Sequence, residues 1–305
     1  MAYEIRIADP DAGLEATFVP EVGMIGASLR HEGEELLHQG NGLQAYAEHD
    51  STFALPLLHP WANRLASWDF ELEGRHVVLD PESPITHRDS ATGTPIHGLL
   101  GASPHWKVTD ADRGLLIAEL DFAAVPEYMA AFPFPHLVRY RASIEGTTLT
   151  VAFAVIASGE IPVPISFGFH PYLTLPGSDR RGWELEIPVA RQALVGERML
   201  PTGESLPVAP HEIDGPLAER TFDDGYPDLR GERPEFVLAD ERRRIALTHV
   251  SGYPVAQVYA PEASQFICYE PMTAPVDALI SGQDLGWVQP GDEFEAIFTI
   301  SVDKP

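Results

Sequence analysis

A histidine at the end of an unusual strand-like segment is the first residue that could do chemistry. In "ISFGFH" (165–170), strand alternation puts large apolar residues on one face and Ser166, Gly168 and His170 on the other. A face of small residues and one imidazole leaves a concave space beside the ring, and glycine in a strand often marks the close approach of a ligand or another backbone. We therefore expect His170 to line a ligand pocket walled by a sheet. The alternative is a core histidine.

Glu270 ends a second apolar segment, "QFICYEP" (265–271), on a face that also carries Phe266 and Cys268. Burial on such a face raises the pKa of a carboxyl group toward the range useful for a general base. The alternative is a glutamate exposed to solvent at a strand end. Cys268 is the one thiol of the chain, and its apolar neighbours are more typical of a small core residue than of a nucleophile.

Other polar residues could hold a substrate without reacting with it. His97 lies between an apolar flank and a glycine in "TPIHGLLG", where a turn histidine that caps backbone groups is the alternative. Arg64 precedes a strand-like segment, and its fixed fork of donors suits sugar hydroxyls or a carboxylate. Asp223 and Asp224 could accept hydrogen bonds from hydroxyls, or could form an Asx turn before the following glycine.

Patterns for several other chemistries are missing from the sequence. "HEGEEL" (31–36) has no second histidine at the i+4 position that a zinc-protease helix needs, and neither a His-x-His pair nor a cysteine pair occurs. A glycine-rich phosphate loop and a Gly-x-Ser-x-Gly turn are also missing. We therefore expect a site that uses no metal and no cofactor.

Composition narrows the range of partners. The chain has 305 residues and a net charge of −26, which disfavours nucleic acid and anionic membranes because both bind basic surfaces. Its longest apolar run, "VAFAVIA" (151–157), is far shorter than the ~20 residues of a membrane helix. One cysteine and a first segment without signal-peptide character favour a cytoplasmic protein. As partners we expect a small molecule and, at most, a second copy of the chain, in a monomer or homodimer.

The elements that must position these residues are strands. A period of two recurs in four segments, with turn residues between them: 68–72, 115–122, 147–155 and 294–302. Proline is abundant, and 45–55 is the best segment for even a short helix. We expect an all-β fold in which sequential strands form one antiparallel sandwich domain over 1–305, with the proline-rich stretch 201–234 as a loop excursion.

In their order along the chain, these segments resemble the aldose 1-epimerase (galactose mutarotase-like) family. The resemblance runs from "ANRLASWDFELEGRHVVL" through "IHGLLG", "FGFHPYLTLPG" and "TFDDGY" to "CYEPMTAPVDAL" and "QPGDEFEAIFTISV". It implies a single-domain antiparallel β-supersandwich with an open cleft walled by a sheet. It also implies interconversion of the α and β anomers of a hexose, a reaction that needs no cofactor.

The resemblance implies a role for each candidate residue. The catalytic residues would be Glu270 as base, His170 as acid and His97 as a second active-site histidine. The substrate-binding residues would be Asn63, Arg64 and one of two neighbouring aspartates, Asp223 or Asp224. We expect these side chains to line one cleft. We also expect the acid and the base on opposite sides of the sugar, within ~8 Å of each other.

Departures from the family pattern bear on the substrate. The family usually has His-Gly-Gly where this chain has His97-Gly98-Leu99, and the form Phe169-His170-Pro171-Tyr172 is more like divergent bacterial branches, including those that act on hexose 6-phosphates. A phosphate ester needs arginines near C6. The arginines available for this are Arg64, the pair Arg139 and Arg141, and the pair Arg180 and Arg181. Because the net charge is strongly negative, we favour a neutral free aldose.

Two other classes of protein are alternatives. A glycoside hydrolase on a similar sandwich usually needs two facing carboxylates, and the sequence offers one strong candidate. A sugar-binding protein without catalysis would keep aromatic platforms such as Trp61 or Tyr172, but would not need Glu270 and His170 together.

Overall fold

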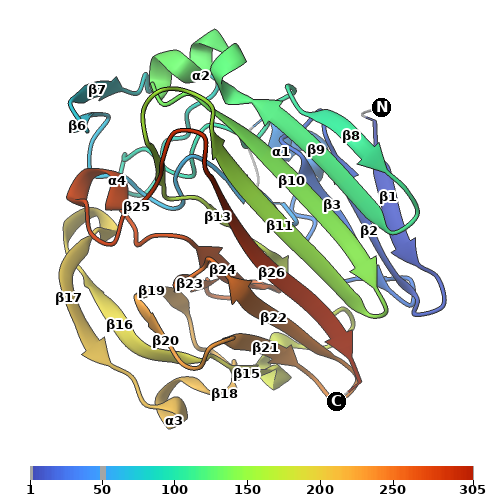
Figure 1. Cartoon of the computed structure of the whole chain (residues 1–305). Coiled ribbons are helices and arrows are strands. Elements are labelled where there is room, and N and C mark those ends of the chain that lie inside the picture. The colour runs from blue at the N-terminus through green and yellow to red at the C-terminus, as the bar shows by residue number, and fades with distance from the viewer. Residues whose placement is uncertain (1–2, 49–52, 305) are drawn as a thin grey trace.

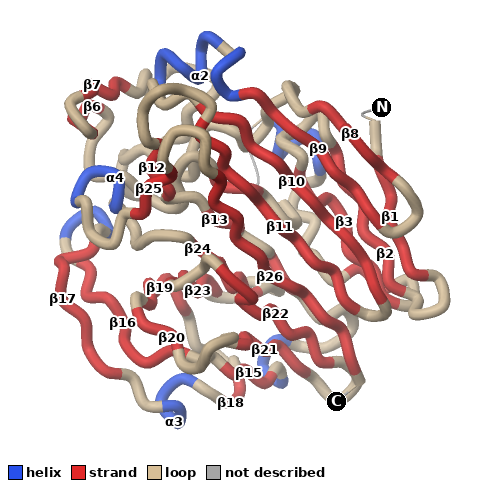
Figure 2. Tube along the Cα trace, viewed as in Figure 1, coloured by secondary structure: helices blue, strands red, loops and turns tan. Residues whose placement is uncertain are grey.

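The computed structural model describes residues 3–48 and 53–304, and strands dominate that part of the chain (Figure 2). The helices are short, as the sequence predicts: α1 (Leu43–Ala47), α2 (Pro126–Ala131), α3 (Pro210–Ile213) and α4 (Ala278–Ser281), with the 3-10 turns η1 (Phe122–Ala124), η2 (Arg180–Gly182) and η3 (Glu197–Met199). The helix expected in 45–55 is confirmed only at its start, in α1, and residues 49–52 lie outside the described residues. None of the described helices is long and apolar enough to cross a membrane.

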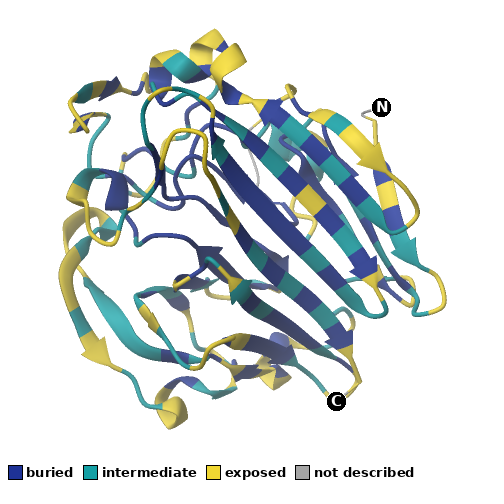
Figure 3. Ribbon diagram, in the orientation of Figure 1, coloured by how far each residue is buried: buried dark blue, intermediate teal, exposed yellow. Residues whose placement is uncertain are grey.

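A nine-stranded antiparallel sheet forms one layer, in the order β18-β15-β21-β22-β26-β11-β10-β9-β8 (Figure 1). Its strands are β8 (Lys107–Ala111), β9 (Leu115–Asp121), β10 (His136–Glu145), β11 (Thr148–Ala157), β15 (Glu184–Glu186), β18 (Gly215–Pro216), β21 (Glu235–Ala239), β22 (Arg244–Ser251) and β26 (Glu293–Asp303). The predicted strands 115–122, 147–155 and 294–302 are confirmed as β9, β11 and β26. Buried and more exposed residues alternate along β9, β10 and β26, as half-buried strands require (Figure 3).

A six-stranded sheet forms the layer that carries the candidate residues. Its order is β19-β23-β24-β13-β5, and β14 pairs with β24 off this path. The strands are β5 (Leu57–Leu58), β13 (Gly168–Phe169), β14 (Tyr172–Leu173), β19 (Phe222–Tyr226), β23 (Val255–Ala260) and β24 (Ile267–Met272). Every residue of β24 is buried, so this strand has no solvent face.

The segment 165–170 is not one continuous strand, which corrects the sequence prediction. It contains the end of β12 (Val163–Ile165), which pairs with β25 (Gly286–Val288), and then β13. Between these strands, the carbonyl of Ser166 accepts the N–H of Ala62 (2.7 Å) and that of Phe167 accepts the N–H of Thr273 (2.9 Å). The chain changes partners there, so a single ladder cannot continue.

The remaining strands form small sheets at the periphery. They are β1 (Ile5–Asp9), β2 (Leu14–Val19), β3 (Ile25–His31) and β4 (Glu34–Glu35); β6 (Asp69–Leu72) and β7 (Arg75–Val78); and β16 (Val189–Val195), β17 (Pro201–Pro207) and β20 (Asp228–Leu229). The predicted strand 68–72 is confirmed as β6. The loop expected over 201–234 is wrong, because this stretch contains α3 and four strands of this and the larger sheets. Prolines begin and end β17, an edge strand, where a missing N–H need cost no ladder bond.

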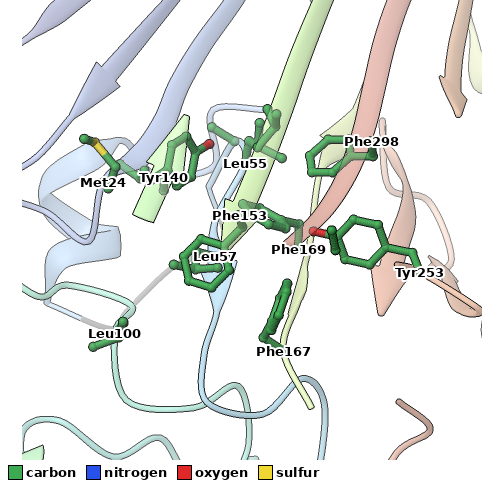
Figure 4. Close-up of a cluster of buried hydrophobic side chains, with 14 of the residues drawn as sticks. Met24, Leu55, Leu57, Leu100, Tyr140, Phe153, Phe167, Phe169, Tyr253 and Phe298 are labelled. Carbon is green, nitrogen blue, oxygen red and sulfur yellow. The ribbon is translucent and has the colours of Figure 1, made fainter. Parts of the chain in front are cut away.

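Aromatic side chains of the two large sheets meet in the core. Phe153 of β11 contacts Phe167 with ring centroids 4.8 Å apart, and Phe298 of β26 contacts Phe169 of β13 at 5.0 Å (Figure 4). The layers therefore pack face to face, which confirms the predicted all-β antiparallel sandwich. Trp61 is completely buried in this core, so it is not available as the sugar platform named for the alternative of a binding protein.

Candidate active site

His170 and Glu270 come into direct contact at the six-stranded sheet. His170 follows β13, Glu270 lies within the neighbouring β24, and His170 Nε2 is 3.2 Å from Glu270 Oε1. Both residues are buried, with 5% and 1% of their surface exposed. The distance of 3.2 Å is well below the expected limit of ~8 Å. However, a pyranose ring cannot fit between two groups that are in contact. The expectation of an acid and a base on opposite sides of the sugar is therefore wrong.

Tyr172 fixes the orientation of the His170 ring. The two rings stack with centroids 4.4 Å apart and an angle of 8° between their planes. The Tyr172 hydroxyl is 3.4 Å from Nε2, but in a stacked pair it lies over the ring face. A hydrogen bond to an imidazole nitrogen lies near the ring plane, so Glu270 is the better-placed partner of Nε2. Tyr172 therefore supports the histidine from one side.

Burial sets the protonation of this pair. Loss of hydration raises the pKa of Glu270 well above its usual range; nearby Asp223 adds to this effect and Arg64 opposes it. Burial also lowers the pKa of His170 to about 3. Both shifts favour the neutral forms, which are a protonated Glu270 and a neutral imidazole. Glu270 Oε2 is buried and has no hydrogen-bond partner among the described residues.

His97 stands beside His170 on a tight turn. The two rings meet edge to face with centroids 5.4 Å apart, and burial lowers the pKa of His97 well below its usual value. His97 and Gly98 both adopt positive φ angles, 63° and 75°. A Cβ on Gly98 would lie 2.2 Å from the carbonyl oxygen of His59, so only glycine fits against that backbone.

Arg64 forms a second polar group, which joins two predicted residues, Asn63 and Asp223, to two that the sequence did not single out. Its Nε donates to Asp89 Oδ2 (2.6 Å), and its guanidinium is 3.8 Å from Asp223. Asn63 supports the same arginine, since its Oδ1 accepts the Arg64 backbone N–H at 2.8 Å. Asp89 follows no pattern in the sequence that links it to Arg64, and only the tertiary contact shows it. Gln257 completes the group by donating to Asp223 (2.8 Å).

The choice between the two aspartates follows from strand alternation in β19. Asp223 lies near Arg64 and accepts a hydrogen bond from Gln257. Asp224 accepts a hydrogen bond from Gln192 of β16 (2.6 Å), away from Arg64. Adjacent residues of a strand point to opposite faces, so only Asp223 joins the group around Arg64.

Two hollows adjoin the buried pair. The larger, of about 390 Å³, is lined by His97, His170 and Tyr172 together with Asp89 and other residues: Tyr46, Phe53, Pro56, Leu57, Leu58, His87, Arg88, Ser90, Ile96 and Gly101. The smaller is lined by Asn63, Arg64, Asp223 and Gln257, along with residues of the β16–β17 hairpin. Gln257, which lines the smaller hollow, is the cross-strand partner of Glu270, whereas Glu270 itself lines neither hollow.

The other arginines named as candidates for a phosphate lie among other partners. Arg139 pairs with Glu119 (2.9 Å) and Glu293 (3.3 Å) on the nine-stranded sheet. Arg180 is buried and donates to two backbone carbonyls, while Arg181 is exposed and pairs with a glutamate. Neither these three nor Arg141 lines either hollow.

Cys268 is completely buried beside Tyr172 and Phe266, and burial raises its pKa well above the usual value. A thiol in this setting is not ionised at neutral pH, which fits the core role that its neighbours predict.

Comparison with known proteins shows the family. The aldose 1-epimerase family model matches residues 4–301. The uncharacterized protein YihR of Escherichia coli K12 is 26% identical over 265 residues, which cover 81% of this chain and 80% of that protein. Among solved structures, a galactose mutarotase-like protein from Clostridium acetobutylicum has a TM-score of 0.83 at 17% identity, with coverage of 100% of this chain and 99% of that one. The Slr1438 protein from Synechocystis sp. PCC 6803 has a TM-score of 0.81 at 20% identity, with coverage of 100% and 97%. The two structures share the fold, and the match over nearly the whole sequence shows that this chain belongs to the aldose 1-epimerase family.

Proposed function

We propose that this chain interconverts the α and β anomers of a neutral free hexose by acid–base ring opening. The buried contact between His170 and Glu270, beside a hollow that His97 and His170 line, is the observation that best supports these roles. His97 orients the ring in the larger hollow, and Arg64 does so from beside it, through its contact with Asp89 of that lining. Asp223 accepts hydrogen bonds from sugar hydroxyls, and Asp224 is left out of the proposed site.

Ring opening requires removal of a proton from the C1 hydroxyl and delivery of a proton to the ring oxygen. Glu270 takes the hydroxyl proton, the O1–H electron pair forms the C1=O1 bond as the C1–O5 bond breaks, and His170 protonates O5. Rotation about the C1–C2 bond and reversal of these steps close the ring on its other face. O1 and O5 are both bonded to C1, so an acid and a base in contact suit this reaction.

The reactive form of the His170–Glu270 pair differs from its neutral form by one proton transfer between the two residues. Moving the proton from Glu270 to His170, across 3.2 Å, gives the carboxylate and the imidazolium that ring opening needs. A sugar hydroxyl that donates to Glu270 Oε2 stabilises the carboxylate, so substrate binding favours the reactive state. After ring opening the pair is neutral again, and no proton has been exchanged with solvent.

The charges around the hollows support a neutral substrate. Arg64 lies between the carboxylates of Asp89 and Asp223, which already balance its charge. A phosphate dianion needs further cationic donors. A pocket of about 390 Å³ is within the usual range for small-molecule sites, roughly 300–1,000 Å³.

One observation favours a hexose 6-phosphate as the alternative substrate. Arg88 lines the larger hollow and stacks on Trp68, with 5.3 Å from its guanidinium carbon to the ring centroid. Its only described ion pair is a long one, 3.8 Å, to the exposed Glu82. An arginine held in this way could turn toward an anionic group at C6.

Polarimetry tests the proposal and its alternatives. Pure anomers of glucose, galactose and glucose 6-phosphate are followed toward equilibrium with the wild-type protein and with Glu270→Gln. We expect faster equilibration of a free hexose, without release of any second product, and loss of this effect in the variant. A kcat/KM tenfold higher for the phosphate ester, lost in Arg88→Ala, would establish the alternative. Sugar binding without any effect on the rate of mutarotation would indicate a sugar-binding protein without catalysis.

We further propose that residues 1–305 form one domain, acting as a monomer or homodimer in the cytoplasm without nucleic acid or membrane as partner. Light scattering of the purified chain after size exclusion reports the oligomeric state, and a mass above that of a dimer contradicts it.

A further inference from the structure

One segment of the chain, residues 56–64, contacts both histidine loops of the site. The N–H of His170 donates to the carbonyl of Pro56 (3.1 Å), near the start of this segment. The N–H of His97 donates to the carbonyl of Asn63 (3.0 Å), near its end. Arg64 is the last residue of the same segment. The position of this segment therefore sets the relative positions of three substrate-facing side chains.

The middle of the segment supports the His97 turn through the backbone of His59. The N–H of Leu99 donates to the His59 carbonyl at 2.7 Å, and Gly98 lies so close that a Cβ would meet that oxygen at 2.2 Å. A shift of the His59 backbone by a few tenths of an ångström must therefore move Gly98 and the adjoining His97.

The side chain of His59 is held in the core by a second histidine, His136 of β10. Their Nε2 atoms are 2.8 Å apart, and the residues are 1% and 0% exposed. His136 Nδ1 lies 2.6 Å from the carbonyl of Phe134, which accepts only, so Nδ1 carries the proton. In the neutral ring, Nε2 of His136 is then the acceptor and His59 Nε2–H the donor. Burial lowers the pKa of both rings, which keeps them neutral.

Aromatic rings leave the His59 donor no other partner. Phe122, Phe153 and Phe167 surround its imidazole, with centroids 5.5–6.1 Å away. Loss of the His136 acceptor would leave a buried N–H unpaired, which destabilises this placement of the ring. The ring then rotates or shifts, and any accompanying shift of the His59 backbone reaches Gly98 and His97 through their tight contact.

We propose that the His59–His136 hydrogen bond is a positioning element of the active site, which holds segment 56–64 so that His97, His170 and Arg64 meet one sugar. The inference rests on the proposed mutarotase function. Neither histidine touches the substrate. They act through the backbone contacts of Gly98 and Leu99 with His59.

Three variants separate positioning from simple packing. His136→Asn keeps a donor to the Phe134 carbonyl but cannot reach His59, whereas His136→Gln places an acceptor near the position of the lost Nε2. His249→Asn is the matched control, because His249 is also buried and donates Nδ1 to a backbone carbonyl, that of Tyr253 (3.0 Å). Its Nε2 has no partner among the described residues, so its removal breaks no contact with the site.

Mutarotation rates and thermal unfolding are measured for all three variants. Misplacement of reacting groups by ångström distances costs up to about 10²-fold in rate, so we expect His136→Asn to lower kcat/KM about tenfold or more. His136→Gln recovers most of this loss, and His249→Asn changes kcat/KM less than about twofold at a comparable drop in Tm. Equal kcat/KM in the two asparagine variants would overturn the inference, while a wild-type protein without mutarotase activity would overturn the proposed function instead.

A measurement on the wild-type protein covers the case in which His136→Asn does not fold. Nitrogen–proton NMR of isotope-labelled histidines assigns the tautomer of each ring. We expect a bare Nε2 on His136 and a protonated Nε2 on His59, with slow exchange of that proton. The opposite tautomers, or rapid exchange with solvent, would contradict the proposed hydrogen bond.

Discussion

The two large sheets of this protein differ in regularity, and the chemistry lies in the irregular one. The β10–β11 ladder of the nine-stranded sheet runs without interruption from His136↔Ala157 to Glu145↔Thr148. In the six-stranded sheet, β13 and β5 contain only two residues each, and β13 meets β24 at the single pair Gly168↔Met272. The β19–β23 and β23–β24 ladders of the same sheet are continuous over five pairs each, so the irregularity is confined to the side of β24 that carries β13 and β5, where isolated bridges adjoin the strands.

The difference shows what each kind of sheet can support. A continuous ladder satisfies its backbone groups and divides its side chains between core and solvent, so a polar side chain on it is usually exposed. A short strand between two covered faces ends inside the protein, and a polar side chain at its end stays buried. His170 is placed in this way, and Glu270 lies on β24, which is covered on both faces. Their shifted pKa values follow from that burial.

The largest expected effect tests whether the six-stranded sheet carries the chemistry. Glu270→Gln removes the base and His170→Asn removes the acid, and each should lower kcat by at least about 10²-fold with little change in KM. Steady-state polarimetry measures both constants. Cys268→Ser, in the same sheet, is the control and should keep most of the activity. Loss of turnover in a folded Cys268→Ser protein, with Glu270→Gln still active, would point to thiol chemistry instead.

A smaller effect is expected in the polar group around Arg64. Asp89→Asn keeps the shape of the side chain but weakens the bond that orients Arg64, so KM should rise about tenfold while kcat falls less than about threefold. Thr92→Val is the matched control, because Thr92 donates to the same carboxylate (2.6 Å) without touching Arg64. A kcat loss in Asp89→Asn as large as that of Glu270→Gln would show that binding and chemistry are not divided between the polar group around Arg64 and the His170–Glu270 pair.

The pH dependence of stability sharpens the comparison further. Because the pKa of Glu270 is raised on folding, the folded state retains this proton after the unfolded carboxyl has lost it near pH ~4.3. Stability from this group is therefore present at low pH and declines as the pH rises through the folded pKa. Glu270→Gln should therefore raise the free energy of unfolding at pH 8 by more than at pH 4. Urea titrations at the two pH values measure this, and an equal difference at both would refute the buried, protonated carboxyl.

The pKa shifts of the buried histidines make stability depend on pH in the opposite direction. The folded pKa of His170 is about 3 and that of His249 about 4, below the ~6.5 of an unfolded histidine. Their contribution to stability is complete above pH ~6.5 and is lost as the pH falls toward those folded values. The wild-type protein should therefore lose stability steadily below pH 6.5, as thermal scans across that range would show. A flat profile would contradict the burial of these rings.

The smallest effect is expected on the outer face of the nine-stranded sheet. Arg139 is partly exposed and pairs with Glu119 and Glu293, and surface pairs of this kind contribute about 0–1 kcal/mol. Arg139→Ala should change stability within that range and leave kcat/KM within about twofold for every sugar. A selective loss of activity toward glucose 6-phosphate would show that the regular sheet also takes part in recognition.

The regular sheet was the easier part to predict from the sequence. Period-two alternation predicts β9, β11 and β26 because one face of each lies on the core and the other is more exposed. The segment 165–170 shows the limit of this signal. Its apolar face is correct, but the change of partners at Ser166 and Phe167 depends on Ala62 and Thr273, which are distant in sequence.

The residues of the candidate site also differ in how well the sequence predicts them. The apolar neighbours of His170 and Glu270 made these two residues predictable. A carboxyl or imidazole group in an apolar segment is unusual, and the sequence alone shows it. Asp89 stands in ordinary polar surroundings, and nothing along the chain distinguishes it from a surface residue. Gln257 lies in the apolar segment "VAQVYA" (255–260), but nothing in the sequence links it to Asp223. His59 and His136 were missed because neither the pair nor its tautomers exist before segment 56–64 is packed against β10.

The amino-acid sequence by itself determined the all-β class, the short helices, the apolar faces and the types of residue available for proton transfer, since each depends on periodicity or on near neighbours. Only the tertiary structure decided that Glu270 and His170 touch, that Asp223 rather than Asp224 faces Arg64, and that Trp61 is buried. Contacts between residues about 100 apart along the chain depend on how strands pair and layers pack. Burial, which sets the pKa values of the pair, exists only once those layers have closed over it.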